Sequence, residues 1–298
     1  MSSFRKARRL LKGTVVEWQS HEVSLLASSL AYSTVFTLAP LAIIVIMIVG
    51  AIFGEVAAEE QIVAQLEELV GAEGAGLLGT AIANMRDQSG EGTLQLVLNL
   101  GFLAFGASGV FAQIQNSLDR IWDVRPEPGR HIFHFLRKRL LSFAMILVLA
   151  FLLLVSTVAN TLLVAVVSTL NQQLPGASYL WQVLQRVVSV GGMTAVFALM
   201  YTILPDVEIR WKDTLVGALI TALLFLVGQF FFGIFLNMAN VGSAYGVAGS
   251  FLIVITWIFY AANILFIGAA FTKVYARQQG APIVPSDFAV ARSDDSAR

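Results

Sequence analysis

Three long segments without a charged side chain constrain this chain more than any other feature. They cover residues 23–54, 140–185 and 214–272, and each is long enough to cross the roughly 30 Å hydrocarbon core of a bilayer. Charged side chains make up only 13% of the 298 residues, against about 25% in an ordinary soluble domain. A soluble core is therefore excluded, and the sequence predicts an all-α, polytopic membrane protein.

The apolar segments accommodate six membrane-spanning helices. Each span needs roughly 20 apolar residues. The second has a thin apolar core because Gly101, Gly106 and Gly109 fall within it, but glycine is common in membrane helices. The predicted spans are residues 26–53, 94–115, 140–168, 184–204, 214–236 and 247–271.

The positions of the basic residues predict the orientation. All 19 lysines and arginines except Arg86 and Arg186 fall on one side of the predicted bilayer. Lysine and arginine resist translocation, so that side is the cytoplasm. Six spans place both basic termini there, whereas five or seven spans would place one of them on the opposite side.

The segments outside the spans divide the chain further. Residues 1–22 are predicted to form an interfacial amphipathic helix, because basic side chains surround an apolar face. The acidic external loop at 54–93 shows two apolar helical stripes around a turn at 71–76, which indicates an amphipathic helical hairpin. Residues 23–277 form the membrane domain, and 278–298 are predicted to be a disordered cytoplasmic tail.

One sequence motif suggests an intramembrane serine protease. Residues 106–109 read Gly-Ala-Ser-Gly, and such an enzyme needs a histidine on a neighbouring span to activate Ser108. His21, His131 and His134 all lie outside the predicted spans. The motif therefore fits close helix packing better than catalysis.

The loop after the second span could hold a nuclease site. It gathers Asp119, Asp123, Glu127, His131 and His134, which are residue types that bind metals or transfer protons. They do not show a recognised ligand spacing, and the nearby arginines are those that the topology requires. A ribonuclease is therefore the disfavoured alternative, and no catalytic residue, metal or cofactor is assigned. The chain also has no cysteine for thiol chemistry.

The predicted spans contain neutral polar residues rather than charges. Arg186 lies near the outer end of its span, where its side chain can reach the interface. An ion-coupled carrier usually places an ionisable group at depth, so that mechanism is disfavoured. No P-loop for ATP is present either. Pro40 must kink the first span, and the neutral polar groups could line a cavity for an amphiphile or join helices.

Four motifs, in order along the chain, resemble the YihY/BrkB family of bacterial inner-membrane proteins. They lie at residues 29–40, 106–122, 204–218 and 243–271. The resemblance implies six helices in the inner membrane and a loose link to the export of lipid or other envelope material and to virulence-related resistance. It does not support the ribonuclease name once given to the family. Ala270 stands where we expect a glutamate in many relatives.

We therefore expect an inner-membrane protein of transporter-like build that moves or binds a lipid or other amphiphile. Its expected partners are membrane lipids and not nucleic acid, and the oligomeric state stays open. The alternative is a non-catalytic scaffold or partner subunit whose motif residues fill helix contacts. Candidate residues for gating or headgroup contact, with structural capping as the rival role, are Tyr32, Pro40, Asn116, Asp119, Arg120, Trp122, Asp206, Arg210, Tyr245 and Trp257.

Overall fold

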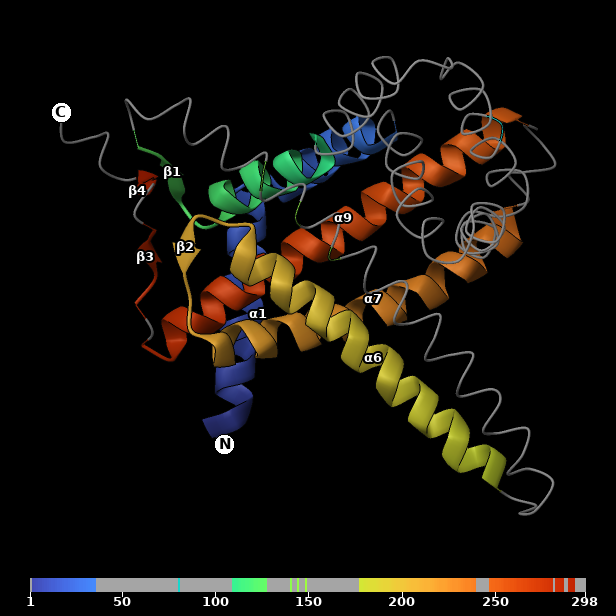
Figure 1. Cartoon of the computed structure of the whole chain (residues 1–298). Coiled ribbons are helices and arrows are strands. Elements are labelled where there is room, and N and C mark those ends of the chain that lie inside the picture. The colour runs from blue at the N-terminus through green and yellow to red at the C-terminus, as the bar shows by residue number, and fades with distance from the viewer. Residues whose placement is uncertain are drawn as a thin grey trace, which may run out of the picture.

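The computed structural model describes residues 2–35, 80, 109–127, 140, 144, 148, 177–239, 247–280, 282–286 and 289–292. Helices dominate this part of the chain, and short strands gather at one side of the view in Figure 1, which we call the strand end. The labelled helices are α1 (Ser2–Ser20), α6 (Ala177–Ile203), α7 (Trp211–Ala239) and α9 (Val247–Gln278). Residues 23–35 and 109–121 are also helical. The strands are β1 (Val124–Pro126), β2 (Val207–Glu208), β3 (Val284–Pro285) and β4 (Ala289–Ala291).

Three described helices are long and apolar enough to cross a membrane. They contain the segments Arg186–Ile203, Trp211–Phe235 and Leu252–Gln278, which agree with the last three predicted spans. The helical residues 23–35 and 109–121 overlap the first two. Most of the first three predicted spans and of the predicted hairpin lies outside the described residues. The count of six and the orientation of the termini therefore stay predictions.

A buried tyrosine joins the three long helices. Tyr201 of α6 is 0% exposed, and its hydroxyl donates a hydrogen bond of 2.7 Å to the carbonyl of Leu265 on α9. The same hydroxyl lies 3.0 Å from the Thr221 hydroxyl on α7. Gly268 of α9 lies so close to Tyr201 and Thr221 that a Cβ atom there would collide with both. Small residues thus let the helices approach, as is common in membrane bundles.

The contact between α7 and α9 depends on further glycines. A Cβ on Gly217 would collide with Thr272, and one on Gly228 would collide with the Tyr260 hydroxyl, whereas Gly233 faces open space. Figure 1 shows α6 diverging from α7 and α9 with distance from the strand end. The three helices therefore pack most tightly near that end.

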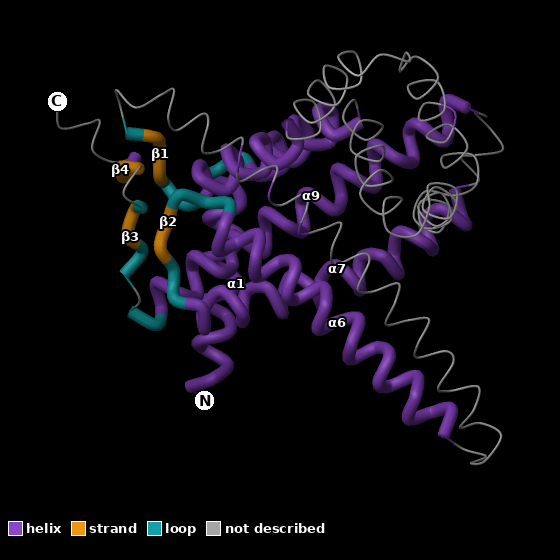
Figure 2. Tube along the Cα trace, in the orientation of Figure 1, coloured by secondary structure: helices purple, strands orange, loops and turns teal. Residues whose placement is uncertain are grey.

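The chain after α9 folds back over the strand end. β3 pairs antiparallel with β2, and β4 pairs antiparallel with β1 (Figure 2). The amide of Ser286 donates to the carbonyl of Asp206 at 3.0 Å, and the amide of Arg292 donates to the carbonyl of Asp123 at 2.8 Å. We call β3 and β4, with the described residues beside them (282–286 and 289–292), the C-terminal strap. The disorder predicted for residues 278–298 does not describe these strands, because backbone hydrogen bonds hold both of them.

The first helix lies against α9 but leaves apolar side chains uncovered. It ends at Ser20, the backbone turns at Glu22 with a φ of 50°, and the next helix begins at Val23. A Cβ on Gly13 would come within 2.8 Å of the Val274 side chain, so the two helices touch closely there. Well-exposed apolar residues on α1 are Leu11, Val15 and Val16. Its position at a membrane surface stays a prediction.

Candidate functional site

Five charged or titratable side chains meet at the strand end, and we call them the charge network. They come from α1, from the turn at its end, from the turn that follows residues 109–121, and from the last turns of α9. No two of these segments are neighbours in the sequence except α1 and its own terminal turn. The members are Glu17, His21, Asp123, Lys273 and Arg277.

Lys273 is the centre of the charge network. Lys273 lies near the end of a long apolar helix, where a charged side chain could reach water, and yet its side chain is 0% exposed. Its ammonium group lies 2.7 Å from a carboxylate oxygen of Glu17 and 2.7 Å from one of Asp123. A buried ammonium is costly unless it is paired and hydrogen-bonded. The burial of Lys273 thus requires that α1 and the Asp123 turn both stay in place.

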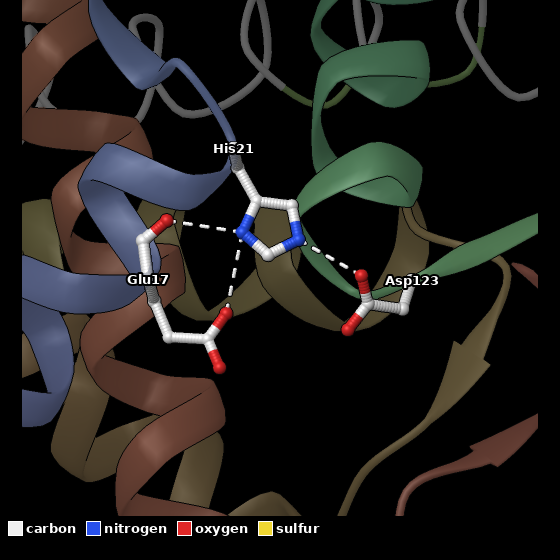
Figure 3. A group of neighbouring side chains, drawn as sticks. All are labelled: Glu17, His21 and Asp123. Carbon is white, nitrogen blue, oxygen red and sulfur yellow. Dashed lines mark hydrogen bonds and ion pairs between the residues drawn. The ribbon is translucent and has the colours of Figure 1, made fainter. Parts of the chain in front are cut away.

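His21 bridges the same two carboxylates (Figure 3). Its Nε2 lies 2.8 Å from Asp123 Oδ1, and its Nδ1 lies 3.0 Å from the Glu17 carbonyl and 3.2 Å from a Glu17 carboxylate oxygen. Carbonyl and carboxylate oxygens only accept hydrogen bonds, so an imidazole protonated at both nitrogens can donate to both residues. The ring therefore adds a second link between α1 and the Asp123 turn.

Asp123 is held through its side chain and through its backbone. Burial raises the pKa of its carboxyl group, but the hydrogen bonds from Lys273 and His21 outweigh that effect and leave the pKa below its ordinary value. Arg277 adds a contact of 3.4 Å to Asp123 and one of 2.9 Å to Glu17. The backbone of Asp123 has a φ of 57°, which is uncommon for a residue other than glycine. This carboxylate thus lies at a turn with a tightly specified conformation.

Donor atoms in the charge network are also spaced as in a metal site. One ligand atom each from Glu17, His21 and Asp123 lies within 4.8 Å of the others. However, the Lys273 ammonium already contacts both carboxylates at 2.7 Å. It takes the position between them that a metal ion would need, so the geometry fits an internal cation better than a bound one.

Two of the predicted site residues form a separate contact close by. Asp119 and Asp206 are 4% and 2% exposed, and an oxygen of the Asp119 carboxylate accepts the amide hydrogen of Asp206 at 2.8 Å. The Asp206 carbonyl in turn accepts the amide hydrogen of Ser286 in the C-terminal strap. Asp119 therefore connects the helix at 109–121 to the loop between α6 and β2, an arrangement that fits the structural role weighed for it.

The other predicted site residues have varied positions. Arg120 pairs with Glu22 at 3.2 Å, and Arg210 pairs with Asp213 at the start of α7 at 3.0 Å. Trp122 is buried beside the charge network. Tyr32 and Asn116 are exposed on their helices. Trp257 packs among aromatic rings that include Phe232. Its position on α9 is about 24 Å along the helix axis from that of Lys273. Pro40 and Tyr245 lie outside the described residues.

The charge network as a whole was missed by the sequence analysis. In the sequence, Lys273 and Arg277 count only among the basic residues of the predicted cytoplasmic side, and Asp123 belongs only to a disfavoured nuclease site. Two signals could have found it. Glu17 is the single acidic residue of α1, and Lys273 follows directly after the longest uncharged segment. Only tertiary structure, however, brings these groups together.

An open cavity of about 540 Å³ lies between the charge network and the C-terminal strap. Its wall carries two arginines beside apolar side chains. The indole N–H of Trp122, which is 2% exposed, has no hydrogen-bond partner within the part of the chain that the structure describes. The cavity is lined by Trp122, Asp123, Val124, Arg277, Ile283, Pro285, Ala291 and Arg292.

The chain is similar to membrane proteins from several bacteria. The family model described as virulence factor BrkB matches residues 14–288. A UPF0761 membrane protein from Coxiella burnetii is 25% identical over 252 residues, which cover 84% of this chain and 87% of that protein. A UPF0761 membrane protein from Pseudoalteromonas translucida is 27% identical over 190 residues (62% and 59%), and one from a Psychrobacter species is 25% identical over 255 residues (81% and 44%).

The chain spans only 59% of the length of the Pseudoalteromonas relative and 44% of the length of the Psychrobacter relative. No solved structure matches this chain significantly. The relatives are named as membrane proteins, in agreement with the three long apolar helices. Because the family model covers residues 14–288, the chain belongs to the YihY/BrkB family of membrane proteins.

Proposed function

We propose that this protein moves a lipid or other amphiphile across the bacterial inner membrane and that the strand end is its cytoplasmic gate. The observation that carries this proposal is the double attachment of the Asp123 turn. Its carboxylate is held by Lys273 and His21, and its backbone carbonyl is held by Arg292 of the C-terminal strap. In this proposal both termini lie in the cytoplasm.

A charged closure suits a gate better than an apolar one. Burying paired charges contributes little net stability, and a switching role is among the best supported uses of such pairs. When the segments separate, water can solvate Glu17, Asp123 and Lys273, so the open state does not expose a large apolar surface. The contacts join segments that are distant in sequence, and therefore breaking them removes the polar links among α1, the Asp123 turn and α9.

The surroundings of the gate suit an amphiphile. The cavity beside the charge network offers Arg292 to an anionic group, and Trp122 and Ile283 to an apolar one. A substrate with both kinds of surface would match this lining.

A disulfide between β1 and the C-terminal strap tests the gate. Arg125 and Val290 are cross-strand partners in the antiparallel β1–β4 pair, a spacing that suits a disulfide, and the chain has no cysteine of its own. The variant Arg125→Cys/Val290→Cys is reconstituted in liposomes with a fluorescent phosphatidylglycerol. Movement between leaflets is followed by quenching from outside with dithionite. We expect movement above protein-free liposomes after reduction, and slower movement after oxidation.

The single variants Arg125→Cys and Val290→Cys, treated with the same oxidant, control for effects of oxidation alone. If the reduced double variant and the unaltered protein move lipid no faster than protein-free liposomes, movement is refuted and the scaffold gains support. If both redox states of the double variant move lipid at the same raised rate, the strand end is not the gate.

A further inference from the structure

A second hollow lies along α1, and Arg277 is the one lining residue that it shares with the cavity beside the strap. It is an open groove of about 500 Å³ between α1 and the end of α9. Val16 and Val274 supply apolar surface, and Arg9, Lys12 and Arg277 supply three cations. The lining is thus apolar with a basic margin.

The charges around the groove do not balance. Glu17 is its single acidic lining residue, and this carboxylate is already paired with Lys273 at 2.7 Å and with Arg277 at 2.9 Å. Arg9 and Lys12 are exposed, and neither has an ion pair among the residues that the structure describes. Two cations therefore remain available to an anionic ligand.

The position of the groove fits the headgroup level of a bilayer. The apolar segment of α9 ends at Gln278, and both Arg277 and Gln278 line the groove. On α1, Val16 is 54% exposed, and Leu11 and Val15 are exposed nearby. A helix with uncovered apolar side chains and many basic ones typically lies in the interface of an anionic membrane.

We propose that this groove is a binding site for an anionic phospholipid. Arg9 and Lys12 contact the phosphate, and the start of the acyl chains lies along Val16 and Val274. The site does not depend on the proposed gate, because it can hold a lipid whether or not the protein moves one. It would place an anionic lipid directly beside Glu17, a member of the charge network.

Native mass spectrometry of the full-length protein in detergent tests the site. Delipidated protein is mixed with equal amounts of phosphatidylglycerol and phosphatidylcholine, and the bound fractions are measured. We expect selective retention of phosphatidylglycerol by the unaltered protein. Since each basic residue near anionic lipid contributes a several-fold gain, Arg9→Ala/Lys12→Ala should weaken that binding by about thirty-fold.

The variant Arg5→Ala/Arg8→Ala is the matched control. It removes the same charge from the same helix, and both of its positions are exposed and outside the groove lining. It should keep most of the selectivity. Equal loss in the two double variants would refute the site in favour of diffuse attraction, and so would equal retention of the two lipids by the unaltered protein. The binding measurement uses no bilayer, so it stands even if the liposome assay shows no lipid movement. Likewise, a failure to bind phosphatidylglycerol here would not contradict lipid movement in liposomes.

Discussion

Replacing Lys273 by methionine should destabilise the protein more than any surface substitution. Methionine keeps the apolar stem of the side chain but removes the ammonium group that lies 2.7 Å from both Glu17 and Asp123. The two carboxylates would then share the charge network with Arg277 and His21 alone. Their mutual repulsion and incomplete pairing are the physical cause of the expected loss.

The structure allows an estimate of the magnitude. Removing one partner of a buried ion pair typically costs 3–5 kcal/mol. The side chain of Glu17 is 16% exposed and that of Asp123 is 43% exposed, so water still solvates part of the negative charge. Arg277 also remains close to Glu17. We therefore expect a loss at the low end, about 3 kcal/mol in the free energy of unfolding.

The assay is reversible unfolding by SDS in mixed micelles at neutral pH, followed by circular dichroism. Lys212→Met, at an exposed position on α7, is the charge-matched control and should change stability by less than about 0.5 kcal/mol. The triple variant with Glu17→Gln and Asp123→Asn should recover much of the loss, because it leaves no unpaired carboxylate. A loss below about 0.5 kcal/mol for Lys273→Met would refute the role assigned to this lysine.

Three further predictions concern pH and helix packing. Because the pKa of Asp123 is lowered in the folded protein, its carboxylate stabilises the fold above its ordinary pKa and loses this effect as pH falls through the lower value. Asp123→Asn should therefore flatten the decline in thermal stability below about pH 4. Gly217→Ala should lower the free energy of unfolding by about 1–3 kcal/mol, because the added methyl group collides with Thr272 of α9. Gly233→Ala on the same helix faces open space and should be neutral or stabilising. Unfolding in SDS compares the two variants. Tyr201→Phe should cost about 1 kcal/mol in the same assay, through its lost hydrogen bonds to α7 and α9.

The long helices could be predicted from sequence because the bilayer imposes a length and a polarity on every span. The segments Arg186–Ile203, Trp211–Phe235 and Leu252–Gln278 overlap the spans predicted at 184–204, 214–236 and 247–271. The β pairs could not be predicted in this way. β2 and β3 have two residues each, and partners more than 70 positions away define them, so local periodicity carries almost no signal.

The candidate site shows a similar limit. Membrane insertion alone explains why basic residues stand at the end of a span. The sequence therefore gives no reason to expect that Lys273 pairs with Glu17 and Asp123. Conversely, Asp119 and Asp206 were selected from a family resemblance, and the structure joins them through one side-chain to backbone hydrogen bond. Their sequence separation gave no sign of that contact. Ion pairs between distant segments are therefore the part of this site that needed coordinates.

The pairing of the C-terminal strap also orders events during biosynthesis. β4 meets β1 and β3 meets β2, and both strap strands are synthesised after α9. A ribosome that is still translating α9 has not yet made the strands that cover the Asp123 turn. The strand end can therefore take its final arrangement only after every described helix has left the ribosome, so a truncated or stalled chain would keep β1 and β2 as uncapped edges.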